Sequence, residues 1–153
     1  MKITLSIDSK EYLEIGNSDL ANFAISMDDE NRYASFYAQL ALHPASEVRS
    51  SVADKYWMPI EAVKLLARDV SIEVVQRVAN NERALQMFEA GLVKEMISRD
   101  VSVAVEIADN LSMVRQGIQE ELIKTLLMHA DPRVVEAAIR FEHELDSELQ
   151  LHE

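Results

Sequence analysis

An internal repeat limits what this chain can fold into more than any other feature of its sequence. The repeat is clearest over residues 44–81, where SEVRSSVA at residues 46–53 has a near copy, SIEVVQRVA, at residues 71–79. A helix-like segment that begins with a proline, PIEAVKLLAR, lies between the two copies at residues 59–68. Repeats of a few tens of residues are typical of stacked helical arrays, in which each unit buries its apolar face on the next.

Valines extend the repeat toward the C-terminus. Val48, Val74, Val103 and Val134 align as the first apolar residue of one helix in each unit, at separations of 26, 29 and 31 residues. Small or branched residues follow four and five positions later, which would let neighbouring helices approach closely. We therefore predict short helices over residues 46–54, 59–68, 72–80, 82–89, 92–99, 101–109, 114–129 and 132–145.

The turns before several of these helices share an aspartate. Asp69, Asp100 and Asp131 stand in the matching segments ARDVS, SRDVS and HADPR. An aspartate at such a turn can cap the next helix by accepting a hydrogen bond from a backbone N–H group. Pro59 suits the first turn of a helix, and Gly91 is expected to divide one helix into two pieces.

The N-terminal residues do not follow the repeat. Residues 2–7 alternate apolar and polar side chains, which indicates a β-strand, and residues 11–15 are either its hairpin partner or a short helix capped by Ser9. We expect one all-α domain over residues 1–153, a short α-α solenoid with an atypical N-terminal cap. The cap spans residues 1–30 and can include a short β-strand or hairpin. The helical repeats span residues 31–145, and an acidic C-terminal tail spans residues 146–153.

The segment at residues 59–81 resembles the leucine-rich repeat variant group of α-helical repeats, which are relatives of the HEAT-like solenoids. The proline-opened helix, the turn Asp69-Val70-Ser71 and the ending Val78-Ala79-Asn80-Asn81 carry this resemblance. It implies a curved helical surface that binds something, usually a protein. Some relatives hold an iron–sulfur cluster in a cysteine-rich segment, a feature that does not carry over because this chain has no cysteine.

Composition narrows the range of partners and locations. The net charge is −12, from 27 acidic and 15 basic residues, which argues against binding nucleic acid or an anionic membrane surface. The absence of cysteine excludes disulfides and thiolate metal sites. The chain also has neither an apolar signal segment nor a run of about 20 apolar residues, so we expect a cytoplasmic protein.

The sequence offers little evidence of catalysis, and we predict no catalytic, cofactor or metal residues. It contains no zinc-protease, calcium-loop, phosphate-loop or nucleophile-elbow motif. His43 and His129 occupy matching turns, where the C-terminal end of a helix favours a cationic imidazole. The paired carboxylates of this acidic chain are interpreted as solvated helix ends.

The candidate binding residues are Tyr56, Trp57 and Met58. They lie in an interhelical turn of the clearest repeat, where polar residues are expected, and exposed Tyr and Trp are favoured in protein interfaces. The alternative is that the N-terminal segment folds over the turn and covers these residues.

Three functional hypotheses follow, and the first is a non-enzymatic protein–protein interaction module, an adaptor or regulator whose partner has a basic surface. The second is an acidic inhibitor or nucleic-acid mimic, because both ends of the chain are acidic: residues 8–31 hold seven acids and one base. The third is an enzyme on a helical-repeat scaffold, which would need a deep pocket. Nucleic-acid binding would require one face lined by the basic residues Arg49, Arg68, Arg77, Arg83, Lys94 and Arg99. The oligomeric state is left open.

Overall fold

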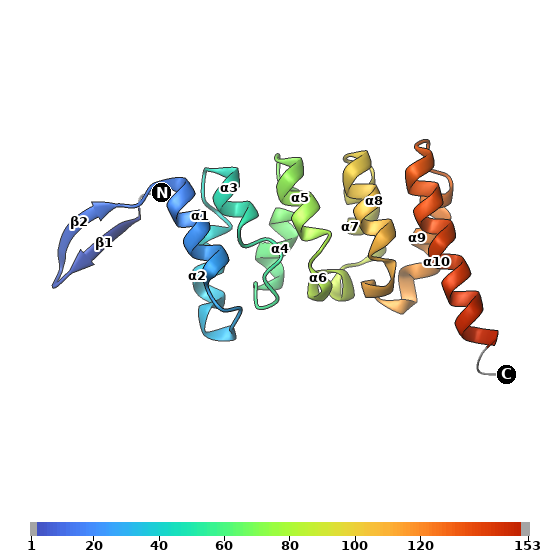
Figure 1. Cartoon of the computed structure of the whole chain (residues 1–153), viewed down its shortest axis with the longest axis horizontal. Coiled ribbons are helices and arrows are strands. Elements are labelled where there is room, and N and C mark those ends of the chain that lie inside the picture. Colours follow the sequence, from blue (N-terminus) through green and yellow to red (C-terminus); the bar gives the residue numbers. More distant parts are fainter. Residues whose placement is uncertain (1–2, 151–153) are drawn as a thin grey trace.

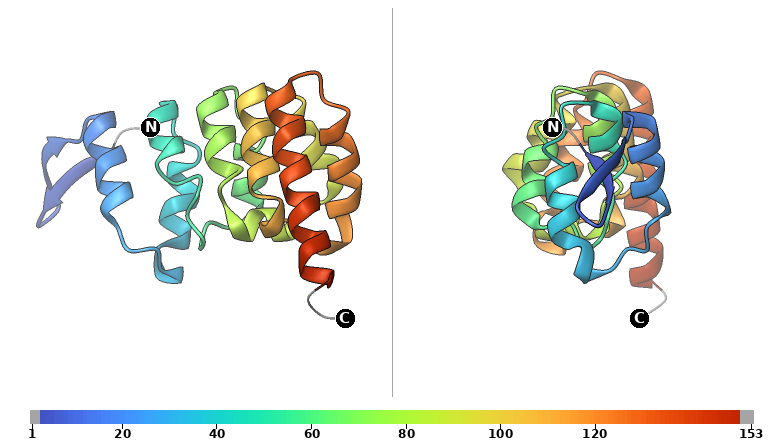
Figure 2. Two further views of the ribbon diagram at one scale, coloured as in Figure 1. Left: turned by 45° about the vertical axis from the view of Figure 1, so that its right-hand side comes forward. Right: turned by 90° about the vertical axis from the view of Figure 1, so that its left-hand side faces the viewer.

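Two rows of helices stand side by side along one axis in this computed structural model, which describes residues 3–150 (Figures 1 and 2). The expected all-α class is confirmed, apart from one N-terminal β-hairpin. The front row of Figure 1 contains α1 (Asn17–Ser26), α3 (Ser46–Ser50), α5 (Ile72–Val78), α8 (Val101–Asp109) and α10 (Pro132–Gln150). The rear row contains α2 (Ala34–Leu40), α4 (Ile60–Leu66), α6 (Glu82–Met87), α7 (Ala90–Ile97) and α9 (Gln116–Leu127), with 3-10 helices η1 (Asn31–Tyr33) and η2 (Leu111–Met113) in two connections.

The core lies between the two rows and follows the predicted periodicity. Val48, Val74, Val103 and Val134 are completely buried, and Val52, Val78, Ile107 and Ala138 four positions later are buried as completely. The residues five positions after the first three valines, Ala53, Ala79 and Ala108, are also buried, but Ile139, five positions after Val134, is 39% exposed. Because α10 is the last helix of the front row, no further helix covers this position.

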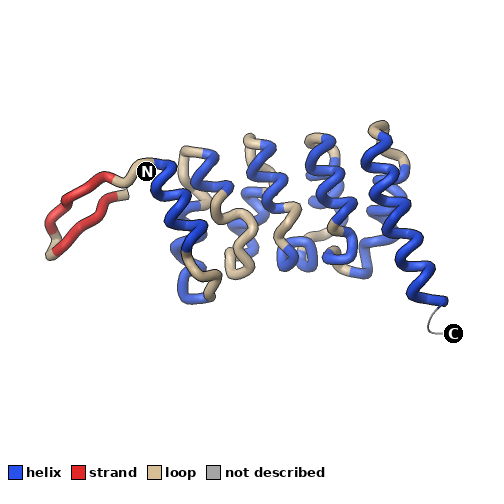
Figure 3. Tube along the Cα trace, in the orientation of Figure 1, coloured by secondary structure: helices blue, strands red, loops and turns tan. Residues whose placement is uncertain are grey.

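An antiparallel hairpin projects from the N-terminal end of the rows (Figure 3). It pairs β1 (Thr4–Ile7) with β2 (Lys10–Glu14), so residues 11–15 supply a strand rather than the alternative helix. Asp8 and Ser9 join the strands with φ values of 50° and 65°. Two central residues with positive φ are characteristic of a type I′ turn, whose twist matches that of the flanking strands.

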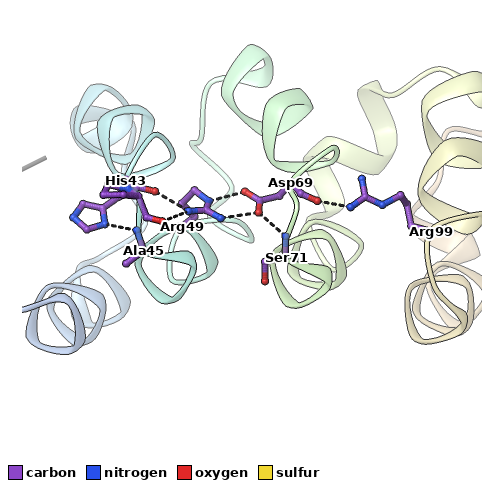
Figure 4. Close-up of polar contacts among 7 residues, drawn as sticks. His43, Ala45, Arg49, Asp69, Ser71 and Arg99 are labelled. Carbon is purple, nitrogen blue, oxygen red and sulfur yellow. Dashed lines mark hydrogen bonds and ion pairs between the residues drawn. The ribbon is translucent and has the colours of Figure 1, made fainter.

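The predicted aspartate turns are confirmed, and one of them holds a partly buried ion pair. The carboxylates of Asp69, Asp100 and Asp131 each accept a hydrogen bond from the backbone N–H two residues later, at 2.9, 2.8 and 3.0 Å. Asp69 also accepts two bonds from the Arg49 guanidinium, at 2.6 and 2.8 Å (Figure 4). Burial by itself would raise the pKa of Asp69, but the hydrogen bonds from Arg49 and Ser71 outweigh it and hold this pKa below its ordinary value.

A second set of polar contacts joins the other ends of the front-row helices. One polar residue after each of three front-row helices makes the same kind of contact: Lys55 after α3, Asn81 after α5 and Asn110 after α8. Each side chain donates to backbone carbonyls at the end of the preceding front-row helix. Asn81, only 2% exposed, donates to the carbonyls of Ala53 and Lys55 at 3.1 Å and accepts from Ala84 N–H at 3.0 Å. These contacts were not predicted from the sequence, although two of the residues recur in the segments VANN and IADN.

Several predicted boundaries are wrong for local reasons. The helix expected over residues 46–54 ends at Ser50, because the chain tightens into turns there and the Ser51 hydroxyl donates to the Val48 carbonyl. The break expected at Gly91 lies instead at Phe88 and Glu89, since the side chain of Phe88 is completely buried and its backbone is extended. The expected acidic tail is helical as far as Gln150, where α10 ends, and residues 151–153 lie outside the described residues.

Helix α1 belongs to the front row although it falls within the predicted N-terminal cap. It packs against α3, as α3 packs against α5 and α5 against α8. Its end is bound by Lys55, whose ammonium donates to the Met27 carbonyl at 2.9 Å. The stacked arrangement therefore begins before residue 31, and only the hairpin stands apart from it.

Candidate functional site

A polar recess of about 550 Å³ lies on the face formed by α1, α3 and α5. A second recess, of about 270 Å³, continues it toward α8, and the two recesses share Glu73 and Arg77. We call them together the front groove. Its polar lining is Ser18, Asn22, Asp29, Glu47, Ser50, Ser51, Asp54, Lys55, Glu73, Gln76, Arg77, Asn80 and Glu106.

The front groove is acidic. Five carboxylates line it, from Asp29, Glu47, Asp54, Glu73 and Glu106, against the two cations of Lys55 and Arg77. The ammonium of Lys55 is directed to backbone carbonyls at the end of α1, so it does not neutralise a groove carboxylate. The groove therefore carries a net charge of −3 and favours a positively charged ligand.

Equivalent glutamates on neighbouring helices line this groove. Glu47 of α3 accepts a hydrogen bond from the Ser18 hydroxyl of α1 at 3.3 Å, and Glu73 of α5 accepts one from the Ser50 hydroxyl of α3 at 3.2 Å. The two glutamates stand one residue before the aligned valines Val48 and Val74. The sequence alone does not mark them as site residues, although both belong to the repeat at residues 44–81.

The aromatic turn, Tyr56 and Trp57, lies beside one end of the front groove. The two rings meet edge to face with centroids 5.3 Å apart, and the side chains are 46% and 36% exposed. The guanidinium carbon of Arg83 lies 5.6 Å from both centroids, and Arg83 donates to the Tyr56 carbonyl at 3.1 Å. These contacts hold the aromatic pair in place and leave part of it open to a partner.

The prediction for Met58 is wrong, because its side chain is 1% exposed and belongs to the core. Met58 N–H donates to the Lys55 carbonyl at 3.2 Å, which closes the turn and carries the methionine inward. Of the three predicted residues, only Tyr56 and Trp57 have side chains exposed enough to contact a partner.

Asp29 links the aromatic turn to the front groove. Its carboxylate lines the groove and accepts hydrogen bonds from the backbone N–H groups of Tyr56 and Trp57, at 2.5 and 3.2 Å. The N-terminal segment thus reaches this turn, as the alternative interpretation expected, but it binds the backbone and leaves the rings partly exposed. Groove and aromatic turn form one continuous candidate site.

The basic residues considered for nucleic-acid binding are dispersed among different contacts. Arg49 and Arg99 bind the Asp69 turn, and Arg83 lies against the aromatic turn. Arg68 pairs with Glu95 at 2.9 Å, Lys94 with Glu121 at 2.5 Å and Arg77 with Asp54 at 3.7 Å. Each of these three cations therefore has an acidic neighbour.

Both turn histidines accept a hydrogen bond at Nδ1. Nδ1 of His43 accepts from Ala45 N–H, and Nδ1 of His129 accepts from Asp131 N–H, both at 3.1 Å. For His43, an accepting Nδ1 corresponds to the neutral imidazole rather than to the cationic form that its position suggested. Burial lowers the pKa of His43 below its ordinary value and reinforces this form.

Among the side chains that the structure describes, no three His, Asp or Glu residues are placed so that they could hold a metal ion. None of the described helices combines the length and the apolar character needed to cross a membrane. Comparisons of the chain with protein-family models, with curated proteins and with solved structures give no match.

Proposed function

We propose that this chain is a non-enzymatic protein–protein interaction module of the cytoplasm, built as a short α-solenoid of the HEAT-like or leucine-rich repeat variant kind. The repeated aspartate turns and the Lys55, Asn81 and Asn110 contacts support a common repeating unit. Such arrays bind partners along the surface that successive helices create.

The front groove, with the aromatic turn at its end, is the observation on which the proposal rests. An open groove with a net charge of −3 suits lysine and arginine side chains, and a partly exposed Tyr–Trp pair suits an apolar contact beside them. The partner is accordingly a protein that presents a basic segment next to an apolar residue.

The two alternative functions have weaker support. A nucleic-acid mimic needs a continuous acidic face, but basic residues alternate with acidic ones at Arg68 and Glu95, Lys94 and Glu121, and Arg140 and Asp109. An enzyme needs an enclosed pocket of convergent groups. The groups with shifted pKa values in the core and the turns, such as Asp69 and His43, are engaged in structural hydrogen bonds there.

Binding of defined peptides tests the proposal. Labelled 12-residue peptides that are basic, neutral or acidic would be titrated with the protein, and fluorescence anisotropy would report binding. We expect the basic peptide with one leucine to bind best, and Glu47→Gln/Glu73→Gln to weaken it about three- to tenfold through lost charge. Trp57→Ala should weaken it by a similar factor and abolish the preference for the leucine.

The matched control is Glu61→Gln/Glu89→Gln, which removes the same charge from the rear row. It should bind as the unmodified protein does, except for a small effect of net charge that disappears in 0.3 M salt. Equal loss in both double variants would show that the groove is not the binding site, and failure of every basic peptide to bind would refute the proposed function.

A further inference from the structure

Arg77 occupies the middle of the front groove and is weakly held there. It lines both recesses, its side chain is 56% exposed, and the contact between its guanidinium and the carboxylate of Asp54 is 3.7 Å long. Among the described residues, two other exposed ion pairs between neighbouring units are closer, at 2.9 Å for Arg68 with Glu95 and 2.8 Å for Arg140 with Asp109. A pair at 3.7 Å lies beyond hydrogen-bond distance, so little energy is lost when Arg77 moves away from Asp54.

The carboxylates around Arg77 have capacity for further donors. Within the described residues, Glu47 and Glu73 each accept one hydrogen bond from a serine hydroxyl, and Asp54 has the long contact to Arg77. An ionised carboxylate has about four acceptor sites and can bind both nitrogens of a guanidinium fork. Each of these three groups can therefore take a lysine or arginine from a partner.

The repeat fixes the spacing of these carboxylates. Glu47 and Glu73 stand at equivalent places on α3 and α5, which pack as neighbours in the front row. Packed helices are about 8–10 Å apart. Three residues of a polyproline II segment span about 9 Å and complete one turn, so side chains three positions apart lie on the same side. A β-strand instead directs residues two positions apart to the same side, about 7 Å from each other, and residues three positions apart to opposite sides. Basic residues three positions apart thus match the groove best.

We propose that the front groove binds a partner segment in the polyproline II conformation with lysine or arginine at every third residue, one of which displaces Arg77 from Asp54. This inference rests on the proposed function and specifies its partner. Arg77 then acts as a specificity-determining residue: it occupies the place of a partner cation, and any ligand must be basic enough to replace it. Charge complementarity along an open groove favours a basic peptide over an acidic or apolar one.

Peptides of identical composition and different spacing test the inference. The first has three arginines separated by two residues each, the second has the three arginines adjacent, and both keep the same serine residues and a single leucine. Anisotropy titration in 0.1 M salt should show the spaced peptide binding at least about threefold tighter. Arg77→Gln should tighten the spaced peptide about three- to tenfold, because it removes the competing cation.

Arg140→Gln is the matched control, since it removes one exposed cation from the end of the front row, outside the groove lining. It should change binding less than Arg77→Gln does. Equal binding of the two peptides, or unchanged or weaker binding in Arg77→Gln, would overturn the inference and leave the proposed function standing. If neither peptide bound, the inference and the proposed function would fail together.

Discussion

Replacing Asp69 by asparagine should destabilise the protein more than any comparable change at its surface. The side chains of Arg49 and Asp69 are 12% and 7% exposed and share two hydrogen bonds of 2.6 and 2.8 Å. Asparagine keeps the acceptor for Ser71 N–H but leaves the guanidinium without its counter-charge. Loss of one partner from a fully buried pair costs about 3–5 kcal/mol, and this pair is only partly buried. Arg49 retains bonds to the His43 and Pro44 carbonyls, so we expect the lower end of this range, about 3 kcal/mol.

Urea unfolding followed by circular dichroism measures this loss. The midpoint should fall without a change in slope, and a loss of about 3 kcal/mol corresponds to a decrease in Tm of about 6–12 °C for a chain of this size. Asp109→Asn is the control, because Asp109 pairs with Arg140 at the surface, where both side chains are about half exposed or more. This variant should lose less than about 1 kcal/mol.

A double-mutant cycle separates the ion pair from other effects of the substitution. If the pair is responsible, Asp69→Asn combined with Arg49→Gln should cost about 2 kcal/mol less than the sum of the two single changes. Additive costs, or a loss in Asp69→Asn no greater than in Asp109→Asn, would refute the reasoning from burial and geometry.

Two further predictions concern stability. Asn81→Ala should lower the free energy of unfolding in urea by about 2–3 kcal/mol. It removes the hydrogen-bond partner of the Ala53 and Lys55 carbonyls and of the Ala84 N–H group. The control is the exposed substitution Asn22→Ala, which should change this free energy by less than about 0.5 kcal/mol. Burial lowers the pKa of His43 in the folded state. As the pH decreases, the unfolded state therefore binds a proton at His43 at a higher pH than the folded state does. The free energy of unfolding should consequently fall as the pH decreases through the ordinary pKa of 6.5. His43→Asn keeps an acceptor for Ala45 N–H and should flatten the dependence of Tm on pH between 7.5 and 5; an unchanged slope would contradict this account.

The buried half of the fold could be predicted from the sequence because its signal is periodic. Val48, Val74 and Val103 recur with the unit, and a valine on a short amphipathic helix has one favourable place, in the core. The aspartate turns were equally predictable, since the capping bond runs from Asp69 to Ser71 and is therefore local.

The candidate site could be predicted only in part because it depends on contacts between units. Glu47 and Glu73 look like ordinary solvated glutamates until α3 and α5 are placed side by side. The segment Tyr56-Trp57-Met58 contains three large side chains of similar hydrophobicity, and the turn closed by Lys55 decides which of them faces inward. The two glutamates recur with the repeat, but the sequence does not show that they line a shared groove, and the inward direction of Met58 leaves no periodic trace.

The contacts made by Lys55, Asn81 and Asn110 have a consequence for how this chain can change in length. Each of these side chains reaches the front-row helix immediately before its own, so the unit that contains α5 presents acceptors to the next unit and a donor to the previous one. A duplicated unit inserted between α5 and α8 would meet a matching donor and matching acceptors at its two junctions. The array can thus gain or lose a whole unit while its hydrogen bonds remain complete, whereas insertion of half a unit would leave buried carbonyls without partners.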